Sequence, residues 1–418
     1  MNWWRGLGQN RLLDAGALVI AMVAAVKIAV VLPQQVKEYD FAHYYVWSRL
    51  LIEGGDPYLD RAEPLYAQYG FVSYRDRPTA TNPPSLLWLF VPFALLTPTL
   101  AFAGWSLVQA SSLCVILWWT RRLLQPRLSS RGWRFVCAGV VASQAVYLHF
   151  CFGQVQLLLA ALLLTAYALH RQGNDTAACL LAAAAGLLKM YPFVLVPWFL
   201  WRSGGGARAR TGRAVLVLAV SMFVIWVTNI QLWQELIRQA LPVVTNYARG
   251  PHLNFSLPSF VATLGNAFLG LSRSAVGAHT WWMVGEAAGL ALTVLAYIAC
   301  SRGDGETEAE FCLLCVTMLA GNMVAWGHYY VFLIFPTAAA ATRIAANPTG
   351  SRIVWFGMVL IAVNVLNMPT VPFLERHLPV KILLNYVPLY GSLALVIFFG
   401  NELRLGRRRC PAPRLSMP

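Results

Sequence analysis

Long apolar runs alternate with short polar segments along nearly the whole chain. Each run approaches the roughly 20 residues that a helix needs to cross the ~30 Å hydrocarbon core of a membrane. Segment 175–201 contains Pro192 and Pro197, so it is either one kinked crossing or two short ones. We expect about 11 to 13 crossings, favour an even number, and place them at 12–32, 84–98, 99–120, 134–152, 154–170, 175–201, 214–231, 281–300, 311–326, 329–345, 353–369 and 381–400.

Two polar segments, 33–84 and 232–280, are too long to be simple turns. Loops of that length usually carry function, so we look for the chemistry there. Within the first segment, 40–53 has helical spacing of apolar residues and ends at Gly54-Gly55, which predicts a short amphipathic helix in the membrane interface. We interpret the chain as one transmembrane domain, residues 1–418, with a basic tail at 402–418.

Composition supports a membrane protein. Hydrophobic residues make up 58% of the chain and charged residues 12%, against roughly 25% charged in a soluble domain. The net charge of +15 is concentrated in alternate loops such as 121–134 and 202–213 and in the tail. This is the positive-inside pattern, which orients the two long polar segments outward. It indicates topology and argues against nucleic-acid binding.

Three positions could carry chemistry, and each has a structural alternative. Asp40 follows the first apolar run and is either a general base or a helix cap. Lys189, with Tyr191 nearby, either binds a phosphate or extends its ammonium to the lipid headgroups. His328 lies at a helix end on the predicted outer side, where histidines are commonly structural.

Other polar residues of the predicted outer side are weaker candidates. Arg75 and Arg77 either hold phosphate or pair with the neighbouring acids, and Gln154, Asn254 and Ser256 are candidates for polar lining. The sequence contains no Walker loop, no GxGxxG motif after a strand, no HExxH and no GxSxG. Nucleotide hydrolysis, Rossmann cofactors and zinc hydrolysis are therefore not indicated.

A series of short motifs runs in order along the chain: DFAHYY from Asp40, GGDPY from Gly54, NPP from Asn82, GQVQ from Gly153, LLKMYP from Leu187, NFS from Asn254 and GHYY from Gly327. In this series the chain resembles glycosyltransferase family 87, whose members have the GT-C fold and use polyprenyl-phosphate sugars. The resemblance implies a GT-C-like helical bundle with short interfacial helices in the first outer loop. It also implies an inverting transfer of a mannose-like hexose or an arabinofuranose to a glycolipid or glycan.

The resemblance also implies roles for individual residues. Asp40 matches the catalytic base, and Lys189, Tyr191 and His328 match the binding site for the donor phosphate. Phe255 stands where the family often has Gln. No cofactor and no metal is expected. Weaker substrate contacts are implied for His43, Tyr44, Arg75, Arg77, Asn82, Gln154, Asn254, Ser256 and Tyr329.

Two functions remain open from the sequence. The first is a transferase of a bacterial inner membrane, with its site on the periplasmic side and with a lipid-linked donor, a glycolipid or glycan acceptor and membrane lipids as its partners. The second is a transporter or flippase of a lipid-linked saccharide. A transporter places its ionisable residues near the bilayer midplane, whereas here they gather at the predicted outer boundary, which favours the enzyme.

Overall fold

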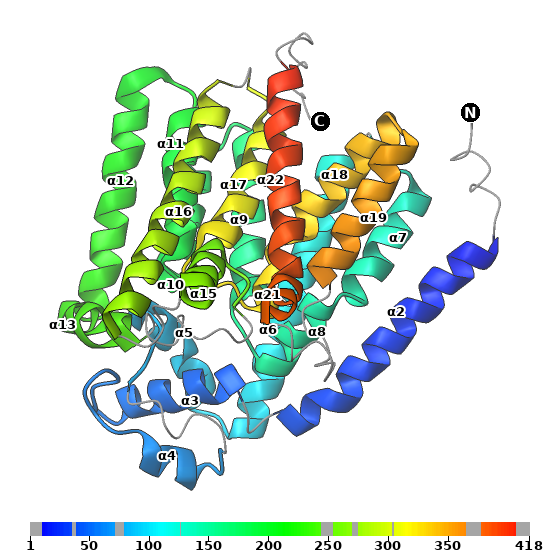
Figure 1. The fold of residues 1–418 in the computed structure, drawn as a ribbon. Helices are drawn as coiled ribbons and strands as arrows, with labels where there is room; N and C mark the ends of the chain where they lie inside the picture. The colour runs from blue at the N-terminus through cyan, green and yellow to red at the C-terminus, as the bar shows by residue number, and fades with distance from the viewer. Residues whose placement is uncertain are drawn as a thin grey trace.

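The computed structural model describes residues 11–35, 39–71, 79–125, 127–243, 254–269, 275–302, 305–364 and 378–406. Within these ranges every regular element is helical and no strand occurs. The first half of the chain forms α2 (Arg11–Val31), α3 (Tyr39–Ile52), α4 (Glu63–Gln68), α5 (Pro84–Ala94), α6 (Pro98–Leu124), α7 (Ser130–Val141), α8 (Gln144–Phe152), α9 (Gln156–Arg171), α10 (Asp175–Leu188) and α11 (Val196–Arg202). The second half forms α12 (Gly206–Val227), α13 (Ile230–Glu235), α15 (Leu257–Leu269), α16 (Ala275–Ser301), α17 (Thr307–Gly321), α18 (Ile334–Ala346), α19 (Gly350–Asn364), α21 (Leu378–Asn385) and α22 (Val387–Gly406) (Figure 1). The all-helical prediction is confirmed.

Short helical segments of other types join several of these helices. The 3-10 segments are η2 (Leu32–Gln35), η3 (Tyr191–Leu195) and η6 (Gly327–Leu333), and η4 (Leu236–Ala240) is a π-helix. Both 3-10 and π segments are frequent where a helix bends or carries a site. Three of the four (η3, η4 and η6) lie in the region described below as the candidate site.

Five helical stretches of the described residues are long and apolar enough to cross a membrane: Asp14–Gln34, Pro98–Leu124, Gly206–Val227, His279–Ser301 and Gly327–Ala346. The pair α7 and α8, bent by 46°, makes a sixth if it is counted as one span. Shorter apolar helices include α9, α10 and α19. The chain is therefore a multi-pass helical membrane protein, and the predicted 11 to 13 crossings include these shorter helices.

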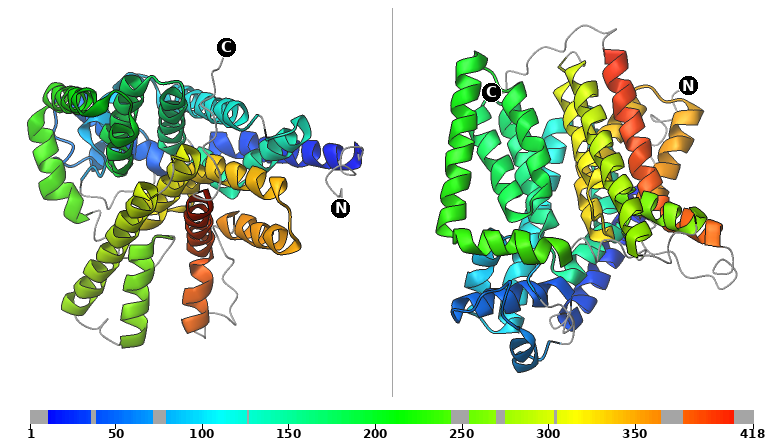
Figure 2. Two further views of the ribbon diagram at one scale, coloured as in Figure 1. Left: turned by 90° about the horizontal axis from the view of Figure 1, so that it is seen from above. Right: turned by 60° about the vertical axis from the view of Figure 1, so that its left-hand side comes forward.

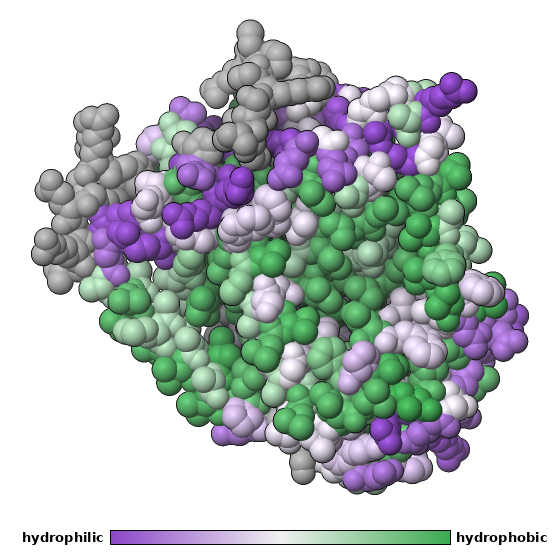
Figure 3. Space-filling model, turned by 180° about the vertical axis from the view of Figure 1, so that it is seen from behind, coloured by the Kyte–Doolittle hydropathy of each residue, from purple (hydrophilic) through white to green (hydrophobic). Residues whose placement is uncertain are grey.

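The surface has the distribution that a bilayer requires. Figure 3 shows an apolar band around the middle of one face, with polar residues gathered above and below it. Leu107 and Trp226 are each 70% exposed on this chain, which is costly in water and favourable in lipid. The apolar excess of the composition thus lies on the outside of the bundle as well as in its core.

The two prolines of segment 175–201 break it as the sequence indicated. α10 ends at Leu188, and Lys189 has an extended backbone, with φ −156° and ψ 115°. The segment η3 begins at Tyr191, directly before Pro192, and α11 follows with Pro197 in its first turn. A proline lacks the N–H that would continue the helix. The break leaves Lys189 outside any helix, at the edge of a cavity.

α3 and α4 lie across one end of the bundle, below the other helices in Figure 1 and at the lower end of the right-hand view of Figure 2. The predicted helix at 40–53 is present, but it does not expose one face. Every residue from Asp40 to Ser48 is buried, because α4, α5 and α8 all pack against α3. The Phe41 ring lies 4.9 Å from Phe102 and 6.4 Å from Phe71, so an aromatic core fixes this helix.

The opposite end of the bundle is held by ion pairs between helices. Arg343 of α18 contacts Glu306 at 2.9 Å, Glu308 at 3.2 Å and Glu402 of α22 at 3.0 Å. Glu308 also pairs with Arg127 after α6. These contacts connect α18, α17 and α22 with the end of α6, so charged side chains support the fold there.

Candidate active site

A cavity of about 180 Å³ lies next to the first turn of α3, where segments from six parts of the chain meet. Its polar lining includes Asp40, Thr81, Asn82, Gln154, Lys189 and Asn322. Its apolar and aromatic lining includes Tyr191, Leu236, Ile237, Leu241, Met323, Val324, Trp326 and Tyr329. A mostly apolar pocket with a few convergent polar groups is the usual form of a ligand site.

Asp40 is the second residue of α3 and is only 6% exposed. It stands inside the first helical turn rather than before the helix. The positive end of the helix dipole stabilises a carboxylate at this position. The same carboxylate lines the cavity, so its contribution to the helix leaves it able to face a substrate.

Lys189 donates a hydrogen bond from its Nζ to Asn82 Oδ1 at 2.6 Å, across the cavity wall. Asn82 is held in turn from behind, because Tyr58 donates its hydroxyl proton to the Asn82 carbonyl at 2.5 Å. Burial, with a smaller effect of the Asp56 carboxylate, keeps the pKa of Tyr58 well above its ordinary value, so the hydroxyl remains a donor. The GGDPY and NPP motifs therefore support the position of the lysine.

Gln154 is fixed by Tyr44, whose hydroxyl donates to Gln154 Oε1 at 2.7 Å. Its amide nitrogen is thereby left as the hydrogen-bonding group for other partners. The preceding Gly153 ends α8 with a positive φ of 66°. A Cβ atom there would stand 2.6 Å from the Cβ of Phe41. α8 can therefore approach the first turn of α3 only because residue 153 has no side chain.

His43 is completely buried and lies behind the cavity wall. Trp47 donates its indole N–H to His43 Nδ1 at 2.9 Å, so Nδ1 is an acceptor and the proton of the neutral ring is on Nε2. That nitrogen lies 3.2 Å from the hydroxyl of Thr81, which lines the cavity. His43 therefore does not line the cavity itself but contacts Thr81, which does.

Asn254 and Ser256 hold the other wall. Asn254 donates to the Met323 carbonyl and accepts from the Ala325 N–H, each at 2.9 Å. Ser256 donates to the same Met323 carbonyl at 3.2 Å. Neither residue is part of the cavity lining. Their bonds fix the extended segment between α17 and η6, whose Met323, Val324 and Trp326 do form that lining.

The aromatic side of the cavity contains Tyr191 and Tyr329, whose rings stack 5.6 Å apart with an interplanar angle of 28°. His328 is adjacent, 4.8 Å from Tyr329 and 5.4 Å from Phe152 between ring centroids. It is 1% exposed and is not part of the lining. Among the described residues, neither ring nitrogen of His328 has a hydrogen-bond partner, whereas the Tyr191 hydroxyl interacts with the Gln156 side chain.

The structure thus brings together most of the residues that the sequence singled out. Asp40, Asn82, Gln154, Lys189, Tyr191 and Tyr329 line one cavity, while His43, Tyr44, Asn254, Ser256 and His328 lie directly behind it. Arg75 and Arg77 lie outside the described residues. Within the described residues no group of three or more His, Cys, Asp or Glu side chains is placed to bind a metal; the expected lack of a cofactor stays a prediction.

Sequence reasoning missed the wall formed by Leu236, Ile237 and Leu241. These residues belong to the π-helix η4 and to the helical residues that follow it, in a segment that was interpreted as an outer loop. Ile237 is 57% exposed and Leu241 is 42% exposed, although both line the cavity. The available signal was the apolar spacing itself, which is unusual for a loop in water and normal for a helix lying against lipid.

The fold and the cavity define a multi-pass membrane protein with a buried polar site. A family model described as glycosyltransferase family 87 matches residues 80–327, more than half of the 418 residues. The chain belongs to glycosyltransferase family 87 and is a membrane glycosyltransferase. The matched region includes Asn82, Gln154, Lys189 and Asn254; Asp40 and His328 lie outside it.

A search of curated proteins finds no match. Among solved structures, the crystal structure of ArnT from Cupriavidus metallidurans in the apo state is similar at 17% sequence identity, over 94% of this chain and 78% of that one. The TM-score is 0.32, which is too low to equate the two helix arrangements.

Proposed function

We propose that this protein transfers a mannose-like hexose or an arabinofuranose from a polyprenyl-phosphate donor to a hydroxyl group of a cell-envelope glycolipid or glycan. The observation that carries this proposal is that Asp40 and Lys189 line the same cavity. One group can accept a proton and the other can neutralise a phosphate. Membership of a glycosyltransferase family favours transfer over transport of a lipid-linked saccharide.

In the proposed reaction, the Asp40 carboxylate accepts the proton of the acceptor hydroxyl as its oxygen attacks the anomeric carbon. The bond from that carbon to the phosphate oxygen breaks, and polyprenyl phosphate leaves with the electron pair. Attack from the side opposite the phosphate inverts the anomeric configuration. No covalent sugar–enzyme intermediate is needed, and the donor and acceptor supply all the atoms.

In this proposal Lys189 binds the donor phosphate and stabilises the negative charge that grows on it as it departs. Asn82 orients the ammonium through the 2.6 Å hydrogen bond. We assign Tyr191, which lines the cavity, and the adjacent His328, whose ring nitrogens have no hydrogen-bond partner among the described residues, to the binding of the same phosphate. A buried polar group without a partner costs free energy until a ligand provides one.

The apolar wall supports a lipid-linked donor. Ile237 and Leu241 line the cavity and are also exposed on the outside of the bundle. A prenyl chain could therefore remain in lipid while its phosphate reaches Lys189. The start of α12, with Arg208, Arg210 and Arg213, and the ends of α11 and α22, with Arg202 and Arg404, lie at the end of the bundle opposite α3 (Figure 1). By the positive-inside rule, we propose that the cavity faces the periplasm of a bacterial inner membrane.

The test is to incubate the purified protein with a panel of polyprenyl-phosphate sugars and a glycolipid acceptor, and to measure released polyprenyl phosphate. We expect release with at least one donor, together with an acceptor product of inverted anomeric configuration. Nucleotide sugars serve as the comparison donors. Sugar transfer from a nucleotide sugar alone, or movement of an intact lipid-linked saccharide across a vesicle without cleavage, would contradict the proposal.

A further inference from the structure

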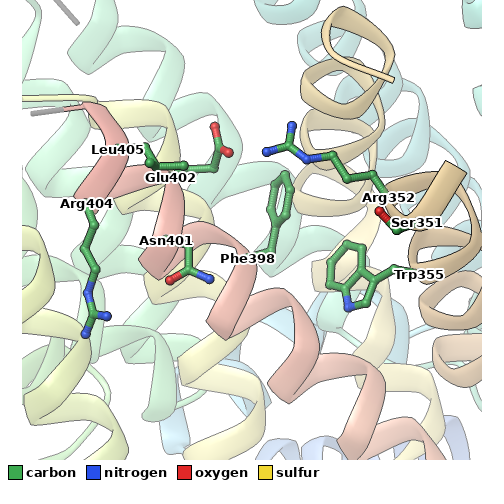
Figure 4. Close-up of a pocket in the computed structure, with 8 residues that line it drawn as sticks. All are labelled: Ser351, Arg352, Trp355, Phe398, Asn401, Glu402, Arg404 and Leu405. Carbon is green, nitrogen blue, oxygen red and sulfur yellow. The ribbon is translucent and has the colours of Figure 1, made fainter. Parts of the chain in front are cut away.

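A second, larger hollow lies at the other end of the bundle, between the start of α19 and the end of α22. Its volume is about 520 Å³. Figure 4 shows Arg352 and Trp355 entering it from α19, and Phe398 and Glu402 entering it from α22. It shares no lining residue with the Asp40 cavity, so it is a separate site.

The charged lining of this groove consists of two arginines, Arg352 and Arg404, and one glutamate, Glu402. Figure 4 shows the Arg352 guanidinium directed across the groove toward Glu402. Glu402 is also bonded to Arg343 at 3.0 Å, a cation that it shares with Glu306 and Glu308. Among the described residues, no carboxylate lies within ion-pair distance of Arg352. The exposed Arg404 also contributes to the lining. An anionic group would therefore be attracted to the groove.

Aromatic rings form the floor of the groove. Trp355 and Phe398 stack with centroids 5.4 Å apart and an interplanar angle of 23°. Tryptophan is enriched at the level of the lipid headgroups, where it presents an apolar ring and a polar N–H together. Ser351 and Asn401 add hydroxyl and amide groups at the rim.

The apolar surface continues from the groove along both helices. Val354 and Met358 of α19 are 63% and 57% exposed, and Ile397 of α22 is 63% exposed. A soluble anion would use the arginine but leave these side chains uncovered. A phospholipid would satisfy both parts, because its phosphate would pair with the guanidinium while its acyl chains covered the apolar side chains.

We propose that the groove between α19 and α22 binds an anionic phospholipid of the inner leaflet, with the lipid phosphate paired to Arg352 and the acyl chains along the exposed faces of both helices. Basic pockets between membrane helices on the cytoplasmic side are suited to such headgroups. The bound lipid joins α19 to α22, two helices that also contact each other directly. The site therefore stabilises this end of the bundle without touching the reaction.

The experiment is native mass spectrometry of the full-length protein in detergent, titrated with phosphatidylglycerol and, separately, with phosphatidylcholine of the same acyl chains. We expect one phosphatidylglycerol to bind before all others. Arg352→Ala should weaken that first binding about fivefold or more, as expected for the loss of one cation near a phosphate. Arg208→Ala is the matched control, because Arg208 is an exposed arginine of α12 at the same end of the bundle.

Two further variants separate binding from misfolding. Arg352→Lys keeps the cation and should retain most of the preference for phosphatidylglycerol, and Trp355→Leu should weaken both lipids alike. Equal losses for Arg352→Ala and Arg208→Ala would overturn the site and indicate diffuse attraction to the basic surface. So would equal affinity of the unmodified protein for the two lipids. Neither result bears on sugar transfer, which is measured separately.

Discussion

The two ends of the bundle use polar side chains in opposite ways. At the α22 end, buried charges are paired: Glu310 accepts hydrogen bonds from Arg202 and Trp198, and Arg343 contacts three glutamates. At the α3 end, among the described residues, both ring nitrogens of the buried His328 have no hydrogen-bond partner. Buried polar groups are nearly always satisfied in a resting fold. The unpartnered histidine beside the Asp40 cavity therefore favours this end as the place of the reaction.

The comparison separates residues that hold the fold from residues that do the chemistry. Removing a member of a satisfied pair leaves a charge buried without compensation, so stability falls. Removing a cavity residue takes away a group that becomes fully engaged only with the substrate, so activity falls first. Substitutions at the two ends should therefore differ in whether they lower activity or stability.

Asp40→Asn should lower sugar transfer by about 10²- to 10⁴-fold, the usual contribution of a general base. The amide has nearly the shape of the carboxylate, so the thermal unfolding midpoint in detergent should change little. The measurement is kcat for release of polyprenyl phosphate. Glu63→Gln makes the same acid-to-amide change at an exposed position of α4 and should leave kcat unchanged. Normal turnover by Asp40→Asn would remove the mechanism.

Arg202→Met should destabilise the protein by about 3–5 kcal/mol, because the Glu310 side chain is fully buried and would lose its cation. The measurement is unfolding in detergent at several temperatures, with transfer per folded molecule as the second readout. The double variant Arg202→Met/Glu310→Gln removes both charges and should recover much of the loss. If Arg202→Met instead unfolds like the unmodified protein but transfers no sugar, Arg202 acts in the reaction and the proposed difference between the two ends is wrong.

Lys189→Met should raise the KM for the donor about 10- to 100-fold, since charge-assisted hydrogen bonds contribute about 1.5–3 kcal/mol. A smaller decrease in kcat is expected, because the phosphate carries charge both before and during bond cleavage. Lys27→Met is the control. Lys27 is exposed on α2 and lies 4.1 Å over the Tyr147 ring. Unchanged donor affinity in Lys189→Met would place the phosphate elsewhere.

Asn254→Ala should cost about 1–3 kcal/mol of stability, because the Met323 carbonyl and the Ala325 N–H lose their partner. The KM for the acceptor should rise only to the extent that the loss of these bonds displaces the cavity wall at Met323 and Val324. Asn364→Ala, which removes a bond within one helix turn of α19, is the control. A large rise in acceptor KM with full stability would instead make Asn254 a direct substrate contact.

Much of the fold was predictable because the bilayer imposes a simple rule on sequence. Apolar runs of spanning length become helices, and prolines such as Pro192 break them, since both effects are local. The burial of α3 was not predictable in the same way. Its aromatic residues can face either lipid or protein, and only contacts with Phe71 and Phe102, distant in sequence, decide between them.

The site was predictable in its members and less so in their arrangement. The motif series brought out Asp40, Lys189 and Gln154, which do share a cavity. It could not distinguish residues that face the substrate from those one layer behind, such as His43 and Asn254, because that difference depends on hydrogen bonds across more than 30 residues of sequence. The cavity wall formed by Leu236, Ile237 and Leu241 was not predicted for a related reason, because these apolar residues carry no reactive group.

Gly153 limits any redesign of this protein for a different sugar. A Cβ atom at residue 153 would stand 2.6 Å from the Phe41 Cβ, so even alanine there would displace the first turn of α3 and the Asp40 carboxylate on it. The shape of the cavity can instead be changed by substitutions at Met190, Asn322 or Met323, which line it. At residue 153 only a hydrogen atom fits.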